Sequence, residues 1–312
     1  MANQVYHNTL GRHALVIGGS MAGLLAARVL LDYFDRVTII DRDRFPADPV
    51  FRPGTPQARH VHIFLARGQQ ELERLFPGIG AKMIAHGAPC IDLIDDAQYY
   101  IGESAAARFP SDLRLYLSTR PLLEWMVRSE LRRRQELTLC EGAEAVELLA
   151  DGNGHVTGVR VRQRTGSADA PTEDLAADLV VDASGRESPA PRWLSALGYT
   201  PPEETAINAF LGYASRIYAR PANHEQMHNW KVLFIPAQAP QILRGGVIWP
   251  IENDQWIVTL AGSGRDYPPT DEAGFLDFAR GMRHQGIYET LKDAKPLTPI
   301  YGYRRTENRR RH

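Results

Sequence analysis

Cysteine is scarce in this chain of 312 residues, which holds only Cys90 and Cys140. There is no CxxC pair and no dense cysteine spacing, so a disulfide-stapled fold is excluded and a reducing cytoplasm is favoured. Long apolar runs are missing too, since no segment approaches the roughly 18 residues of a membrane span. The first residues lack the basic start and apolar core of a secretory signal. We therefore expect a cytoplasmic protein with no membrane span.

The net charge of the chain is also small. The chain has 36 Lys and Arg against 37 Asp and Glu, a formal charge of -1, which creates no field to gather nucleic acid. Within the basic end at 301–312, the last nine residues carry five arginines but no interleaved aromatics, so a nucleic-acid partner is not expected there either. Hydrophobic residues at 44% and charged residues at 23% are typical of a globular protein. The length suggests about two domains, and a small molecule is the expected partner. Composition leaves the oligomeric state open.

The first 40 residues follow a strand, turn, helix, strand pattern. An apolar run over 13–17 precedes glycines, helical spacing follows over 21–31, and β-branched residues occupy 37–40. Parallel strands need such a crossover, so this segment predicts a βαβ unit that opens a doubly wound sheet. Four prolines predict a long loop over 44–57, and helical spacing returns over 61–76.

The later patterns indicate a second kind of sheet. Residues 88–109 predict two or three strands of a different sheet, and Thr119 can cap a strong helix that ends near Leu131. Further expected strands cover 138–149, 156–164, 179–181, 210–218, 231–235, 245–249 and 255–260, with a helix over 271–282. The turn at 151–154 is a hairpin signal. From residue 201 onward the pattern predicts an antiparallel sheet.

A glycine motif lies between the first strand and its helix. Residues Gly18–Gly23 match the dinucleotide fingerprint G-x-G-x-x-G, except that Ser20 replaces the second glycine. Gly18 permits a tight turn, Ser20 is small enough for a pyrophosphate to approach, and Gly23 allows close packing of helix and strand. Asp41 ends the second strand, where a carboxylate can accept ribose hydroxyls and disfavours NADP. A glycine turn without a ligand remains the structural alternative.

Four blocks together carry a family resemblance. The chain resembles the FAD-dependent oxidoreductases of the flavin monooxygenase superfamily, with the aromatic-hydroxylase fold that geranylgeranyl reductases and flavin halogenases share. The blocks are Val16–Leu24, Asp41–Arg42, Ser118–Leu123 and Val180–Ser188. The resemblance implies an α/β fold: a Rossmann-like FAD/NAD(P)-binding domain with an inserted, mainly antiparallel β-sheet substrate domain. It places the FAD-binding domain at 1–87 and 110–200, and the substrate-binding sheet domain at 88–109 and 201–300.

The resemblance also implies FAD as cofactor, with NAD(P)H as a possible transient electron donor. The glycine motif would hold the pyrophosphate, Asp41 the adenosine ribose, Arg120 the ribityl or phosphate region, and the backbone of Val146 the adenine. The Arg59 to His62 stretch would lie near the flavin or its entrance, although a structural role stays open there and for Arg120. The implied cofactor-binding residues are Gly18, Ser20, Met21, Ala22, Gly23, Asp41, Arg42, Arg59, Arg120, Val146 and Ser184. His60-x-His62 has no third ligand, so no metal site is expected.

Three departures from the family pattern qualify the function. Ser184 stands where aromatic hydroxylases carry an aspartate that organises FAD and the transient nicotinamide. A serine at this position is nearer to the pattern of the reductase and halogenase branches. Trp249 and Trp256 do not have the spacing of the halogenase W-x-W-x-I-P motif, so halogenation is disfavoured. The late G-D motif that covers the ribityl chain is missing. We therefore expect a C-terminally truncated member that lacks the last part of its FAD-binding domain.

Two functions remain in view at this point. The first is an FAD-dependent oxidoreductase, monooxygenase-like or reductase-like, that acts on a small hydrophobic or aromatic substrate. The alternative is a truncated, non-catalytic remnant that binds FAD weakly or not at all. A nicotinamide dehydrogenase would need a Tyr-x-x-x-Lys site, which the chain lacks. No catalytic residue is assigned, since His60, His62 and Tyr213 are equal candidates. Four aromatic residues could form an apolar substrate wall or belong to the core: Phe210, Tyr213, Trp249 and Trp256.

Overall fold

The computed structural model describes residues 10–165 and 170–312, which divide into two compact units. The first unit comprises the chain up to Thr55 together with Glu124–Thr205 and Arg311–His312. The second unit comprises Pro56–Leu123 and Ala206–Arg310. Each unit is therefore built from separate stretches of the chain.

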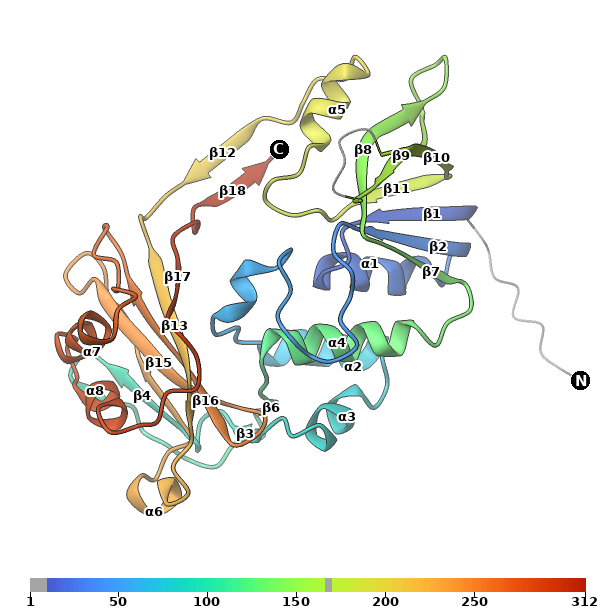
Figure 1. Ribbon diagram of the computed structural model, residues 1–312. Helices are drawn as coiled ribbons and strands as arrows, with labels where there is room; N and C mark the ends of the chain where they lie inside the picture. The colour runs from blue at the N-terminus through green and yellow to red at the C-terminus, as the bar shows by residue number, and fades with distance from the viewer. Residues whose placement is uncertain (1–9, 166–169) are drawn as a thin grey trace, which may run out of the picture. The chain divides into compact units, whose positions relative to one another are not determined.

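A four-stranded parallel sheet forms the centre of the first unit. Its order is β11-β1-β2-β7, and α1 packs against β1 and β2 (Figure 1). The bounds are β1 Gly11–Ile17, α1 Met21–Leu30, β2 Phe34–Asp41, β7 Leu137–Glu141 and β11 Leu179–Asp182. The apolar stretch of β1 is buried because a parallel sheet is covered on both faces. The expected βαβ unit is confirmed.

An antiparallel sheet of three strands, in the order β10-β9-β8, completes the first unit with a short helix. The bounds are β8 Ala143–Ala150, β9 Val156–Gln163, β10 Thr172–Ala176 and α5 Ala190–Ala196. The turn between β8 and β9 is the expected hairpin, in which Asp151 Oδ1 accepts the N–H groups of Asn153 and His155 at 2.9 Å each. Gly154 adopts a φ of 85° in this turn, a conformation that favours glycine.

A seven-stranded, mainly antiparallel sheet dominates the second unit. Its order is β17-β13-β16-β15-β14-β4-β5, and only the β14–β4 pair among these described strands is parallel. The bounds are β4 Ala97–Ile101, β5 Ser104–Ala105, β13 Gly212–Ala219, β14 Val232–Ile235, β15 Arg244–Ile251, β16 Gln255–Gly262 and β17 Tyr301–Tyr303. Helices α7 Glu272–Arg280 and α8 Gly286–Leu291 lie on one face of this sheet (Figure 1). Phe275 and Ile287 bury their side chains there with Trp256.

Shorter elements complete the second unit. They are the 3-10 turn η1 Pro56–Arg59, α2 Ala66–Leu75, α3 Ile79–Ala85, the antiparallel pair β3 Cys90–Asp92 and β6 Arg114–Tyr116, and α6 His224–Met227. Helix α4, Arg120–Leu131, begins in the second unit and continues into the first. The helix expected from residue 61 begins only at Ala66, because residues 60–62 are held by hydrogen bonds instead, such as that from the Val61 N–H to Thr259 Oγ1 (3.1 Å).

The α/β fold class with a mainly antiparallel second sheet is confirmed, but the units divide the chain differently from the expected domains. Residues 56–87 and 110–123 belong to the sheet unit, where His60 bonds to Ser215 of β13 and Thr119 to Glu252 just after β15. The basic end at 301–312 contains β17 and β18 Asn308–Arg311, and β18 pairs with β12 Glu204–Ile207. Among the described residues, no helix is long and apolar enough to cross a membrane.

Candidate functional site

The glycine loop of the first unit needs its glycines for steric reasons. Gly18 has a φ of 99°, and a Cβ there would lie 2.5 Å from the carbonyl oxygen of Ala183. A Cβ on Gly23 would lie 1.7 Å from the carbonyl oxygen of Gly18. The backbone is therefore packed too tightly for a larger residue at either position. Ser20 stands in extended conformation just before α1, so the loop delivers the chain into a helix N-terminus, the usual place for a phosphate.

Asp41 braces this loop from the end of β2. The carboxylate is buried, and its Oδ2 accepts the Gly19 N–H at 2.6 Å while its Oδ1 accepts the Asp43 N–H at 2.8 Å. Burial raises the pKa of Asp41, although the positive charge of Arg52 and the two N–H donors oppose the shift. Both N–H groups favour the ionised form of the carboxylate. Asp41 therefore holds the glycine loop in place as well as ending β2.

A buried ion cluster supports Asp41. Arg52 Nη1 contacts Asp43 Oδ2 at 2.8 Å and Asp41 Oδ1 at 3.4 Å, while its Nε donates to Glu124 Oε1 at 2.8 Å. Ser20 Oγ donates to Glu124 Oε2 at 2.8 Å, which ties α4 to the glycine loop. Burial disfavours the charge on Arg52, but the carboxylates outweigh it and the net pKa is raised.

Sequence reasoning missed Arg52, Asp43 and Glu124. One signal was available: Glu124 and Arg128 lie four residues apart on the apolar face of a strong helix, where unpaired charges would be costly. No comparable pattern marked Arg52, which lies in a proline-rich loop.

The remaining expected residues of the first unit lie on both of its main sheets and on α1. The Ser184 N–H donates to Asp182 Oδ1 at 2.9 Å, and its Cα would lie 3.0 Å from a Cβ on Gly18, so Ser184 is beside the glycine loop. Val146 falls in β8 between Ala145 and Glu147, where the register with β9 shifts. Three others occupy the following places: Met21 buried and Ala22 exposed in the first turn of α1, and Arg42 exposed after β2.

Two histidines of the second unit sit in different polar surroundings. His60 is buried, and its Nδ1 lies 2.8 Å from Ser215 Oγ, which in turn lies 2.6 Å from Thr259 Oγ1. Burial, with the nearby charges of His62 and Arg59, lowers the pKa of His60 to about 4. His62 Nδ1 lies 2.9 Å from the carbonyl oxygen of His60. Burial lowers the pKa of His62 too, and the positive charge of Arg120 adds to that effect.

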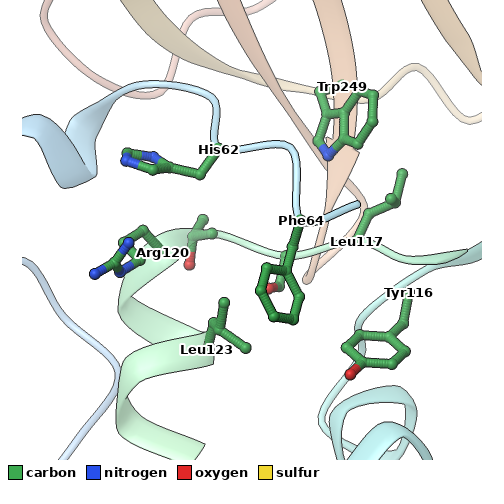
Figure 2. A pocket seen from close by; sticks show the side chains of 9 residues that line it. His62, Phe64, Tyr116, Leu117, Arg120, Leu123 and Trp249 are labelled. Carbon is green, nitrogen blue, oxygen red and sulfur yellow. The ribbon is translucent and has the colours of Figure 1, made fainter. Parts of the chain in front are cut away.

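A small pocket in the second unit brings His62 and Arg120 together. Arg120 is the first residue of α4, and Trp249 on β15 lines the same pocket (Figure 2). The full lining is His62, Phe64, Tyr116, Leu117, Ser118, Thr119, Arg120, Leu123 and Trp249. The Trp249 indole N–H and the Tyr116 hydroxyl are buried without a hydrogen-bond partner among the described residues. Burial and the charge of Glu73 raise the pKa of Tyr116 to about 12, so this hydroxyl stays protonated.

The start of α4 is held by a carboxylate that sequence reasoning missed. Glu252 accepts the Thr119 N–H at 3.0 Å on Oε2 and the Thr119 hydroxyl on Oε1, while Thr119 Oγ1 accepts the Leu122 N–H at 3.3 Å. Glu252 and Thr119 are both buried. These residues lie 133 positions apart in sequence, so no local pattern could have paired them.

The structure thus assembles the expected residues in two groups. The glycine loop, Asp41 and Ser184 meet in the first unit, and His62 and Arg120 meet in the second. Arg59 lies nearby in the sequence, but its guanidinium packs 4.1 Å from the ring centroid of Tyr301. Of the aromatic residues considered for a substrate wall, Trp249 lines the pocket, Trp256 belongs to the sheet core and Phe210 is exposed. The Tyr213 ring centroid lies 6.1 Å from that of His60.

One curated relative shares much of this sequence. Protein Rv3254 of Mycobacterium tuberculosis (strain ATCC 25618 / H37Rv) is 34% identical over 292 residues, which is 91% of this chain and 60% of that protein. The chain therefore spans about three fifths of the length of this relative. No protein-family model matches the chain.

Solved structures share its fold. The flavin-dependent brominase Bmp2 superposes with a TM-score of 0.66 at 15% identity, covering 94% of this chain and 67% of that chain. PqsL, a probable FAD-dependent monooxygenase from Pseudomonas aeruginosa, also gives 0.66 at 13% identity, with 94% and 73% covered. The myxobacterial chondrochloren halogenase CndH gives 0.56 at 16% identity, with 96% and 64% covered. The chain has the fold of the flavin-dependent monooxygenases and halogenases, as its sequence resemblance implied.

Proposed function

We propose that this protein is an FAD-dependent oxidoreductase, monooxygenase-like or reductase-like, that acts on a small hydrophobic or aromatic substrate. The observation that carries the proposal is the glycine loop, where a Cβ at Gly18 or Gly23 would collide with backbone. Such close packing keeps the loop backbone close to the N-terminus of α1, so that a diphosphate can approach the helix N–H groups. The similar folds of flavin-dependent enzymes support the same proposal.

The residues of the first unit suit the adenosine half of FAD. Asp41 presents a carboxylate at the end of β2 that is held by Gly19, and carboxylates there accept ribose hydroxyls. The positive charge of Arg52 favours the ionised form of Asp41, and its contact with Oδ1 helps to hold the carboxylate in place. Ser20, Met21, Ala22 and Arg42 would line the diphosphate and ribose, Val146 would meet the adenine and Ser184 would flank the loop.

Two arginines of the second unit suit the flavin half of the cofactor. Arg120 would reach the ribityl or phosphate region of the cofactor, and Arg59 would lie near the flavin. When bound, the flavin supplies hydride transfer or oxygen activation, while the protein orients the substrate and excludes water. NAD(P)H is the proposed electron donor, in keeping with the fold, and Ser184 in place of an aspartate makes a transient nicotinamide contact weaker.

The test is a visible spectrum of the purified, desalted protein, followed by titration with FAD while flavin fluorescence is recorded. A retained flavin band, or submicromolar binding that Asp41→Asn and Gly23→Ala weaken and Gly152→Ala does not, would support the proposal. Gly152 is the matched control, because a Cβ there meets nothing within 4 Å. A folded protein that neither carries nor binds FAD would sink the enzyme proposal and favour a non-catalytic remnant.

A further inference from the structure

His62 has one tautomer, which the backbone imposes. Its Nδ1 lies 2.9 Å from the His60 carbonyl oxygen, and a carbonyl can only accept a hydrogen bond. Nδ1 must therefore carry the proton, so Nε2 presents a lone pair. None of the residues in 10–165 or 170–312 donates a hydrogen bond to this nitrogen.

The electrostatics of the second unit keep His62 neutral. Burial lowers its pKa, and the positive charge of Arg120, which lines the same pocket, lowers it further. The hydrogen bond to the His60 carbonyl has the opposite effect but does not reverse the shift. At neutral pH the side chain therefore acts as a hydrogen-bond acceptor in this pocket rather than as a cation.

Trp249 presents the complementary group. Its side chain is 3% exposed, it lines the pocket, and its indole N–H has no partner among the described residues. An indole nitrogen can only donate, and a buried donor without an acceptor is costly to the fold. Such a group is a candidate contact for a ligand atom. Apolar side chains of Phe64, Leu117 and Leu123 form other walls of the pocket (Figure 2).

We propose that His62 and Trp249 form a specificity pair for the substrate of this enzyme: His62 Nε2 accepts an O–H or N–H of a flat apolar ligand, and the Trp249 N–H donates to an acceptor on it. The inference rests on the proposed function, because a substrate pocket presupposes the enzyme. The proposal assigns this pocket to the substrate rather than to the flavin. It predicts that the protein distinguishes a ligand with a donor from its methylated analogue.

The experiment measures binding of 4-methylphenol and 4-methylanisole to the purified protein by equilibrium dialysis at neutral pH, with and without FAD. The two probes differ at one group, since a methyl group replaces the hydroxyl proton in 4-methylanisole. The phenol stays neutral because its pKa is near the value of about 10 of a tyrosine. The phenol should bind about fivefold or more tightly than the ether, which is the effect of one hydrogen bond.

Three variants locate the effect. His62→Asn keeps an N–H for the His60 carbonyl but removes the Nε2 acceptor, and Trp249→Phe keeps the ring but removes the donor. His62→Asn should bring the preference for the phenol close to one, because it removes the acceptor for the hydroxyl proton. Trp249→Phe should instead weaken the binding of both probes about fivefold, because both carry the oxygen that accepts the indole N–H. Trp256→Phe is the matched control, because Trp256 is also buried with an unpartnered indole N–H but lies in the sheet core. It should leave the affinities for both probes, and the preference between them, unchanged. Trp249→Phe tests the pair independently if His62→Asn does not fold.

Several outcomes would overturn the proposal. They are equal binding of the two probes, a preference that survives in folded His62→Asn, unchanged affinities in folded Trp249→Phe, and competition between FAD and 4-methylphenol, which would assign the pocket to the flavin. FAD titration of the same samples separates the two proposals. Flavin binding without any phenol preference overturns the specificity pair and leaves the oxidoreductase intact. A phenol preference without flavin binding supports a ligand pocket and rejects the flavoenzyme.

Discussion

Gly23 is the residue whose substitution should disturb the glycine loop most. A Cβ at this position would lie 1.7 Å from the Gly18 carbonyl oxygen, so the loop or α1 must move in Gly23→Ala. We expect a loss of about 2 kcal/mol of unfolding free energy, in the range of overpacking in a close-packed site, and weaker FAD binding. Urea unfolding measures the first effect. Gly152→Ala should stay within about 0.5 kcal/mol of the wild type, and an equal cost in both variants would contradict the steric argument.

Arg52 is the cation on which three buried carboxylates depend. Arg52→Met keeps much of the apolar stem but leaves Asp41, Asp43 and Glu124 without its positive charge. Removing one partner of a buried ion pair costs about 3 to 5 kcal/mol, so urea unfolding near pH 7 should show a large loss.

The pH dependence of Arg52→Met follows from the same charges. Burial already raises the pKa of Asp41, and the loss of the positive charge of Arg52 should raise it further, so the native state takes up a proton more readily. The deficit should therefore shrink as the pH falls toward the ordinary carboxylate range. The exposed pair Arg67–Glu71 supplies the control, since Arg67→Met should cost less than about 1 kcal/mol. A deficit that does not change with pH would argue against buried charge as the cause.

At the scale of elements, the start of α4 depends on a contact that is distant in sequence. Thr119→Ala removes the acceptor for the Leu122 N–H and leaves the buried Glu252 carboxylate without a hydroxyl donor. A lost cap costs about 1 kcal/mol and a weakened buried acceptor about 1 to 3 kcal/mol. We expect a total near 2 to 3 kcal/mol in thermal or urea unfolding.

Two variants calibrate the prediction on α4. Thr119→Ser keeps the hydroxyl and should recover most of the stability. Asp271→Ala removes an exposed cap, which accepts the Gly274 N–H at 2.8 Å at the start of α7, and should cost only about 1 kcal/mol. If both alanine variants cost the same, Glu252 does not contribute as argued.

At the scale of the whole molecule, the stability of the folded state should decrease as the pH falls, because of buried histidines. The pKa of His60 is lowered to about 4, so the folded state binds its proton less readily than the unfolded state does. This contribution is fully present above the unfolded pKa of about 6.5, and it is lost as the pH falls from there toward the folded value. At pH 5 the loss is roughly 2 kcal/mol from His60 alone. Burial lowers the pKa values of His13 and His62 as well, so they act in the same direction.

Urea unfolding at pH 7 and pH 5 tests this. The drop in stability should be smaller in His60→Gln than in the wild type, because glutamine does not titrate. His86→Gln changes an exposed histidine and should leave the drop unchanged. A wild-type drop that persists in full in His60→Gln would show that other groups cause it.

Several features of the structure could be predicted from the sequence alone. The glycine loop, the strand that ends at Asp41 and the hairpin at 151–154 follow from residues that are neighbours along the chain, because turns and helix starts are short-range structures. The same holds for most strands after residue 201, whose β-branched and aromatic residues favour strands, and β15 and β16 are buried along nearly their whole length. These patterns also carry the family resemblance, and the similar solved structures confirm the fold.

Only the tertiary structure decided which distant residues meet. Arg52 joins Glu124 across 72 positions, and His60 joins Ser215 across 155, and neither pairing leaves a local pattern. The 61–65 segment departs from its helical spacing because hydrogen bonds to β13 and β16 stabilise an extended path. The sequence by itself thus determined many of the elements and the glycine loop, because those depend on near neighbours. The fold determined the buried charge cluster and the tautomer of His62, because desolvation and hydrogen-bond partners exist only after the chain has packed.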